Sequence, residues 1–86
     1  MLFQGDSFAV GEEAEYQEDG ARFRVRVKEK VQSGRDMTLT LTVLEVFNGP
    51  FHGARCPKVG SDISVSEYDG AGINAGWTLS QYLSSN

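Results

Sequence analysis

The chain has few of the residues that hold small proteins together through covalent links or metal ions. Its 86 residues include one cysteine, Cys56, and one histidine, His52. A single cysteine cannot form an intramolecular disulfide, and it excludes a zinc site built from several thiolates. Hydrophobic residues make up 40% and charged residues 23% of the chain, as in ordinary folded domains. We therefore predict one small domain that is stabilised by a packed core.

Long apolar runs and an excess of basic charge are also lacking. No stretch approaches the roughly 20 apolar residues of a membrane helix, and the N-terminus lacks the features of a signal peptide. We therefore expect a cytoplasmic protein that does not bind membranes. The net charge of −4 argues against a protein that coats nucleic acid through its overall charge. Leu2-Phe3-Gln4-Gly5 resembles the core of a picornaviral 3C protease site, so residues 1–6 are expected to be disordered or an added tag.

Residues 21–31 alternate between apolar and mostly basic side chains, which predicts a β-strand. The preceding Asp19-Gly20 favours a two-residue type I′ turn, whose central residues both need positive φ. This turn pairs Glu18 with Ala21 and sets a register in which apolar residues oppose each other and glutamates oppose arginines. The predicted pairs are Tyr16–Phe23, Ala14–Val25, Glu15–Arg24, Glu13–Arg26, Gln17–Arg22 and, farther from the turn, Phe8–Val31.

Residues 37–47 predict a third strand, with alternate residues from Met37 to Val43 on its apolar face. Residues 32–36 are predicted to connect it to the second strand, with Gly34 in a left-handed conformation. Beyond Val43 the alternation slips, which predicts a β-bulge or burial of both faces at that end. The predicted cross-strand pairs are Val31–Met37, Val27–Leu41 and Val25–Val43.

The C-terminal half supplies two further predicted strands. Residues 48–60 contain glycines and prolines without a helical period and are predicted to form a loop. Residues 60–68 alternate again and predict the fourth strand. Residues 73–83 predict the fifth strand, and a short C-terminal helix starting at Trp77 is the alternative. Residues 84–86 are expected to fray.

Five strands that begin with a three-stranded meander must bury one face of their sheet. In a chain of this length the available architectures are a small barrel and a two-layer sandwich. We predict an all-β domain over residues 1–86, a five-stranded antiparallel barrel of OB-like type. The helix usual between the third and fourth strands of that fold is missing. An SH3-like barrel, or a sheet with a short C-terminal helix, is therefore the alternative.

The residues that could carry catalysis are sparse. A Cys–His nucleophile would need His52 and Cys56 in contact with each other and with a third, orienting group. On a loop beside Pro57 we interpret them as partly exposed side chains. Residues 69–74 lack side-chain oxygens at positions that a calcium loop needs, and the nearby glycines lack the spacing of a dinucleotide site. We therefore predict no enzyme activity, no metal and no cofactor.

The polar face of the second and third strands is the candidate ligand site. Its cations and hydroxyls could hold phosphates, and the equivalent face of OB-type barrels binds oligonucleotides. However, Glu13 and Glu15 are predicted to neutralise two of the arginines, and the face is predicted to lack aromatic residues on which bases stack. Two lysines opposite Gly11 and Ala9 are predicted to be the unpaired cations. The candidate ligand-binding residues are Lys28, Lys30, Arg35, Thr38 and Thr40.

Two functions follow from these patterns. The first is a non-enzymatic module, accessory or inhibitory, that binds a protein partner. Its candidate partner-binding residues, Phe51 and His52, lie in the predicted loop. The alternative is a module that binds single-stranded nucleic acid or another phosphorylated ligand on the basic face. We favour the first function because the overall charge is acidic.

Overall fold

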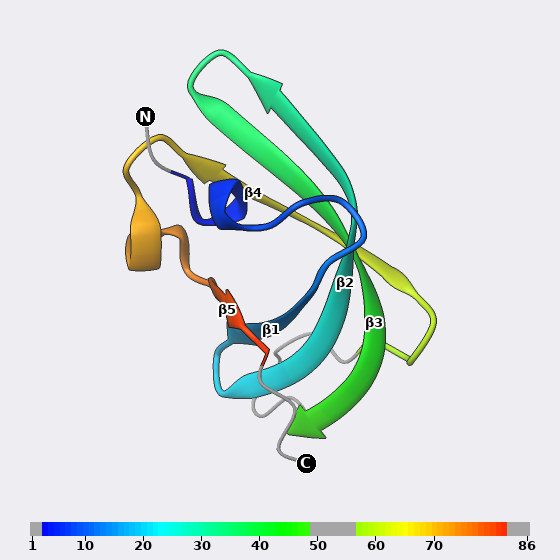
Figure 1. Cartoon of the computed structure of the whole chain (residues 1–86). Coiled ribbons are helices and arrows are strands. Elements are labelled where there is room, and N and C mark those ends of the chain that lie inside the picture. Colours follow the sequence, from blue (N-terminus) through cyan, green and yellow to red (C-terminus); the bar gives the residue numbers. More distant parts are fainter. Residues whose placement is uncertain (1–2, 49–56, 83–86) are drawn as a thin grey trace.

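One antiparallel sheet of five strands forms the body of the molecule (Figure 1). The computed structural model describes residues 3–48 and 57–82. Its elements are the 3-10 turn η1 (Gln4–Ser7), β1 (Glu13–Glu18), β2 (Ala21–Ser33), β3 (Asp36–Asn48), β4 (Asp62–Tyr68), the 3-10 turn η2 (Gly72–Ala75) and β5 (Thr78–Gln81). The strands lie in the order β4-β3-β2-β1-β5. The all-β class and the single antiparallel sheet are thus confirmed, while the described sheet is open between its edge strands β4 and β5.

The first hairpin has the predicted register throughout the paired part of β1. All six predicted pairs from Glu13–Arg26 to Glu18–Ala21 are present. Asp19 has a φ of 49° and Gly20 a φ of 83°, the two positive values that a type I′ turn requires. Pairing ends before the predicted Phe8–Val31 contact. Phe8 is buried, whereas Val31 is 48% exposed, so that prediction was wrong.

A bulge in β2 explains why Val31 faces solvent. The pairs Val27–Leu41 and Val25–Val43 are confirmed, but Val31 lies opposite Thr38 rather than Met37. The register shifts between Val27 and Glu29, which leaves Lys28 as an extra residue on β2. One extra residue moves every later side chain of a strand to the other face.

The connection between β2 and β3 is also shorter than predicted. Ser33 pairs with Asp36, so only Gly34 and Arg35 form the turn. Gly34 has a φ of 61°, and Arg35 is not among the residues with positive φ, as expected for a type II′ turn. The predicted five-residue connection was therefore wrong.

The predicted irregularity after Val43 is confirmed as two further bulges. Arg24 pairs with Glu45 while Val25 pairs with Val43, which leaves Leu44 without an opposite residue. The next register shift leaves Phe47 unpaired in the same way. These shifts let β3 bend strongly at this end of the sheet (Figure 1).

β4 and β5 complete the sheet on opposite edges. β4 alternates as predicted, with Ile63 and Val65 buried, and it pairs with β3. The predicted fifth strand is shorter than expected, because residues 72–75 form η2 and the strand itself pairs with β1. The alternative helix from Trp77 was wrong, since the chain is extended from Thr78 to Gln81. No helix within the described ranges is long and apolar enough to cross a membrane.

The strongly bent sheet encloses the core on its inner face, and η1 packs into this concave side (Figure 1). Phe3 is only 5% exposed and belongs to the core, so the structure packs residues 3–6 against the sheet, although the sequence alone set residues 1–6 apart from the fold. A Cβ on Gly5 would lie 2.8 Å from Sδ of Met37. The core residues are Phe3, Phe8, Ala14, Tyr16, Ala21, Phe23, Val25, Val27, Met37, Leu39, Leu41, Val43, Ile63, Val65, Trp77 and Leu79.

The side chain of Gln4 links the two edges of the open sheet. On the β4 side its Nε2 donates to Oε2 of Glu67 at 3.1 Å, and its backbone N–H donates to the same carboxylate. On the β5 side Nε2 donates to the carbonyl of Trp77 at 3.0 Å, and Oε1 accepts from the N–H of Leu79 at 2.9 Å. Glu67 is 3% exposed, so this bridge satisfies a buried carboxylate.

Candidate interaction surface

A ladder of ion pairs crosses the outer face of the sheet, the face opposite the core. Glu13 joins Arg24 at 2.7 Å and Arg26 at 3.2 Å, and Glu15 joins Arg22 at 3.1 Å. The backbone register is the predicted one, yet the side chain of Glu15 pairs diagonally with Arg22 rather than with Arg24. Two further pairs extend the ladder: Arg24–Glu45 at 3.3 Å and Lys28–Asp62 at 2.7 Å.

These pairs keep the ladder ionised and nearly neutral. The hydrogen bond from Arg24 lowers the pKa of Glu13, and the one from Arg22 lowers the pKa of Glu15. The hydrogen bond from Lys28 similarly lowers the pKa of Asp62, while the same contact raises the pKa of Lys28. A cation that already contacts a carboxylate presents little net potential to an incoming anion. The ladder is therefore a weak attractor for phosphates.

The predicted pair of free lysines is not present. Lys28 binds Asp62, which also accepts a hydrogen bond from Thr42 at 2.8 Å. Lys30 lies opposite buried Leu39, because the bulge at Lys28 moves its side chain to the inner side of the sheet. There its Nζ donates to the carbonyl of Phe8 at 2.7 Å. The prediction that these two lysines lack an acidic partner was therefore wrong for Lys28, whereas the recorded partner of Lys30 is an uncharged carbonyl.

The five candidate ligand residues consequently do not converge on one surface. Thr38 and Thr40 lie on the outer face, and Thr38 shares a hydrogen bond of 3.0 Å with Ser66. Lys30 points to the opposite face, and Arg35 lies in the hairpin turn. Lys28 shares the threonine face but is engaged with Asp62.

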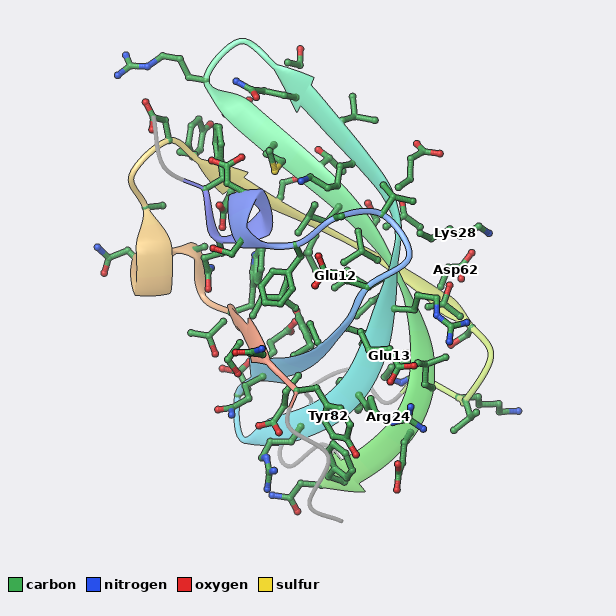
Figure 2. The ribbon with its side chains drawn as sticks, in the orientation of Figure 1. Glu12, Glu13, Arg24, Lys28, Asp62 and Tyr82 are labelled. Carbon is green, nitrogen blue, oxygen red and sulfur yellow. The ribbon has the colours of Figure 1, made fainter. Side chains whose placement is uncertain are left out.

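Two aromatic rings join the outer face beside the arginines, contrary to the expectation that this face lacks them. Phe47 and Tyr82 are stacked, with ring centroids 6.0 Å apart and an angle of 11° between their planes. The guanidinium of Arg22 lies 5.4 Å from the ring of Phe47. That of Arg24 lies 5.5 Å from the ring of Tyr82, and Figure 2 labels these two side chains. We call Arg22, Arg24, Phe47 and Tyr82 the arginine–aromatic cluster. Its position follows from the third bulge, which leaves Phe47 36% exposed.

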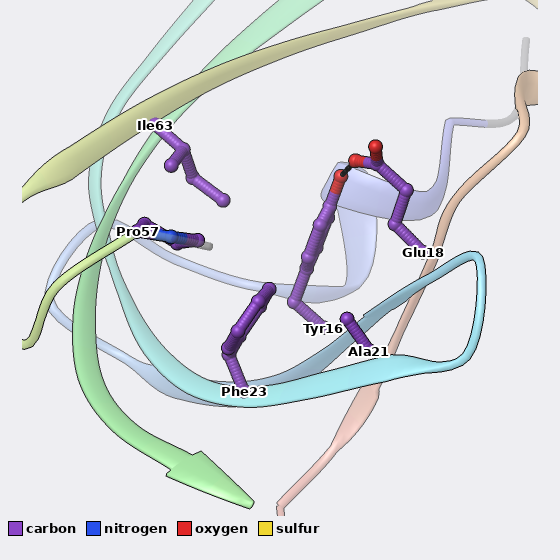
Figure 3. Close-up of a pocket in the computed structure, with 6 residues that line it drawn as sticks. All are labelled: Tyr16, Glu18, Ala21, Phe23, Pro57 and Ile63. Carbon is purple, nitrogen blue, oxygen red and sulfur yellow. Dashed lines mark hydrogen bonds between the residues drawn. The ribbon is translucent and has the colours of Figure 1, made fainter. Parts of the chain in front are cut away.

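A small apolar cavity lies at the end of the core next to the first hairpin (Figure 3). Tyr16 and Phe23 stack there with ring centroids 6.1 Å apart, and the Tyr16 hydroxyl donates to the carboxylate of Glu18. Pro57 and Ile63 face these rings from the other side. The cavity volume of about 10 Å³ has room for about one water molecule, so it is too small for an organic ligand.

The remaining predicted site residues, Phe51, His52 and Cys56, lie outside the residues that the structure describes. Within residues 3–48 and 57–82, no group of three or more histidine, cysteine, aspartate or glutamate side chains is placed to hold a metal ion. Comparison of the chain with protein-family models, with curated proteins and with solved structures finds no match. The arguments for a function of this surface therefore come from its own geometry.

Proposed function

We propose that the chain is a non-enzymatic module that binds a protein partner through the arginine–aromatic cluster. The observation that carries this proposal is the stack of Phe47 and Tyr82, with Arg22 beside the one ring and Arg24 beside the other, on a largely polar face. Tyrosine, phenylalanine and arginine are enriched in protein interfaces, and tyrosine and arginine are frequent energetic hot spots. The ion pairs around them would form the polar rim that surrounds such a centre.

Preorganisation supports the same proposal. Arg24 is held by Glu13, by Glu45 and by the ring of Tyr82, and its side chain is only 26% exposed. A side chain that is already fixed loses little conformational entropy when a partner covers it. The cluster therefore offers contact area at a low entropic cost, which flexible surface lysines do not.

Binding of single-stranded nucleic acid is the second candidate function. It gains one specific argument, because Phe47 and Tyr82 supply aromatic rings on which bases could stack. The neutral ladder opposes it, since phosphate recognition relies on uncompensated positive charge. An affinity for single-stranded nucleic acid that falls steeply as the salt concentration rises would support this function.

We also propose that the open sheet is closer to an SH3-like than to an OB-like barrel. An OB fold is a Greek-key barrel, whereas the first four strands here are consecutive neighbours. The 3-10 turn η2 then carries the chain across to β5, which pairs with β1. An experimental structure that placed β4 next to β1 would contradict this assignment.

The functional test compares three forms of the chain after circular dichroism has shown that each is folded. They are the wild type, the double variant Phe47→Ala/Tyr82→Ala, and the control Tyr68→Ala. Tyr68 is an exposed tyrosine on the same outer face, in β4. Each immobilised form is incubated with cell extract, and retained proteins are cross-linked and quantified by mass spectrometry. Each form is also titrated with labelled oligo-dT at several salt concentrations.

We expect at least one protein to be retained about thirtyfold more by the wild type and by Tyr68→Ala than by the double variant, because truncating a hot-spot residue costs about 2 kcal/mol or more. Equal retention by all three forms would overturn the proposal. Oligo-dT binding that falls steeply with salt and is lost in the double variant would replace it with the second function. Phe51→Ala in the same assay tests the loop contact predicted from the sequence.

A further inference from the structure

We infer that the free edge of β5 receives an extended peptide segment carrying a basic residue, which adds to the sheet as a strand. The inference rests on the proposed function in taking the partner to be a protein, and it names the form of the segment that is bound. Strand addition to an exposed edge is an established mode of peptide recognition, in which main-chain hydrogen bonds supply affinity. Four features of the β5 edge point to it.

The first feature is the direction of the backbone groups. Leu79 lies opposite Tyr16 and Gln81 lies opposite Ala14 on β1. The N–H of Leu79 donates to Gln4, so it points away from β1. Since alternate residues of a strand direct their N–H and C=O groups to the same side, the carbonyl of Leu79 and both groups of Gln81 also point to the free edge. The structure gives them no partner within the described ranges.

The second feature is the amide group that already binds this edge. The side chain of Gln4 accepts from the N–H of Leu79 at 2.9 Å and donates to the carbonyl of Trp77 at 3.0 Å. The N–H and C=O of a single residue in a neighbouring strand would make the same pair of bonds. Gln4 therefore occupies the start of the edge, and an added strand would begin at the carbonyl of Leu79 and run along Gln81.

The third feature is a groove of about 420 Å³ along this edge, within the usual range for ligand sites. The segment that follows η1 forms its other wall. Glu12 is the acidic side chain that lines it, at the position marked in Figure 2. Its Oε1 accepts from the N–H of Ala9 at 2.9 Å, and no described residue donates to its Oε2. A lysine or arginine of the bound segment would complement this carboxylate. The lining residues are Gln4, Ser7, Phe8, Glu12, Leu79, Ser80 and Gln81.

The fourth feature is the contrast with the other edge of the sheet. On β4, the indole N–H of Trp77 donates to the carbonyl of Ser66 at 3.1 Å, so a side chain occupies the middle of that edge. Proteins commonly cover exposed edges to prevent unwanted pairing. The β5 edge is covered only at its start, by Gln4, and opens into a groove instead.

The experiment uses a blocked octapeptide of alternating threonine and valine with one central lysine. Two matched peptides carry glutamate or proline at the central position. Each is titrated into the full isotope-labelled chain, and backbone amide shifts and hydrogen exchange are followed by NMR. Two variants of the chain distinguish backbone from side-chain effects. Gln81→Pro removes the N–H at the free edge without removing a bond to β1, and Gln81→Ala keeps that N–H.

We expect the lysine peptide to slow exchange of the Gln81 amide about tenfold or more at saturation, and to bind Gln81→Ala as well as the wild type. Binding should fall at least tenfold in Gln81→Pro and for the proline peptide. The glutamate peptide should bind about fivefold more weakly, and Glu12→Gln should remove that preference. Unchanged Gln81 exchange, or equal binding by Gln81→Pro and the wild type, would overturn the inference. The peptide titrations do not test Phe47 and Tyr82. If they failed, the proposed function would still be supported by a protein that the wild type retains from cell extract and the Phe47→Ala/Tyr82→Ala variant does not.

Discussion

The bridge made by Gln4 should contribute a large share of the stability of this domain. Replacing Gln4 by alanine removes three side-chain hydrogen bonds at once. They join Gln4 to the Glu67 carboxylate, to the Trp77 carbonyl and to the Leu79 N–H, and together they connect the two edges of the sheet.

The size of the effect follows from the groups that lose a partner. Leaving a buried polar group unsatisfied costs about 1–3 kcal/mol. All three bonds are only partly buried, and Gln4 and Leu79 line the groove beside β5, so water can replace part of what is lost. Taking the low end for each group predicts a loss of about 3 kcal/mol. This is a large fraction of the roughly 5–15 kcal/mol that stabilises a typical domain.

Urea denaturation followed by circular dichroism measures the loss, and two variants show whether it arises from the bridge. Gln4→Glu keeps an acceptor for Leu79 but places a second carboxylate against Glu67, so it should be at least as destabilising as alanine. Adding Glu67→Gln should recover part of that loss, because the pair again combines one amide with one carboxylate. A Gln4→Ala variant within about 0.5 kcal/mol of the wild type would refute the reasoning, as would Gln4→Glu with wild-type stability.

Three further predictions test the strand geometry and the ladder. Val27→Thr should cost about 1–3 kcal/mol because it buries a hydroxyl, whereas Val31→Thr should change stability by less than about 0.5 kcal/mol; equal losses in urea denaturation would contradict the bulge at Lys28. Gly20→Val should lose about 1–2 kcal/mol or more, since a β-branched residue would have to adopt positive φ; unchanged thermal unfolding would contradict the type I′ turn. Glu13 and Glu15 have lowered pKa values in the folded chain, so their contribution is present above the ordinary glutamate pKa of about 4.3 and is lost as the pH falls through the folded values. The stability difference between the wild type and Glu13→Gln/Glu15→Gln should therefore shrink on acidification, and a constant difference would argue against the ladder.

The first hairpin could be predicted from the sequence because one local signal determined it. Both central positions of the turn have positive φ, and Asp-Gly is among the few dipeptides that tolerate this. Once the turn is located, strict alternation allows only one register, and apolar pairs and opposite charges agree with it. The side-chain partners were less predictable. Glu15 reaches diagonally to Arg22, because long side chains also contact neighbours that are not directly opposite.

The second hairpin was only partly predictable because two arrangements fit its sequence. A five-residue connection and a two-residue turn with a bulge both place Val27 opposite Leu41. Gly34 at the first central position was the available signal for the shorter turn. No comparable signal marks Lys28 as the bulged residue, since lysine is compatible with either strand face.

The role of the N-terminal segment depends on contacts between residues far apart in the chain. Its resemblance to a protease site led to its exclusion from the predicted fold, yet Phe3 is in the core and Gln4 contacts both edge strands. Glu67, the partner of Gln4 on β4, was not predicted from the sequence either. An acidic residue at an inward position of a predicted strand is an observable signal that a polar partner must reach it in the folded chain.

The bulges, rather than the regular alternation, determine which residues are available for binding. Strict alternation would leave Lys30 on the outer face beside Thr38 and Thr40 as a basic site. The extra residue Lys28 instead turns Lys30 toward Phe8. The extra residue Phe47 has the converse effect, because it adds an aromatic ring to the outer face beside Arg22. The same irregularities thus weaken the case for a phosphate site and create the cluster on which the proposed protein interface rests.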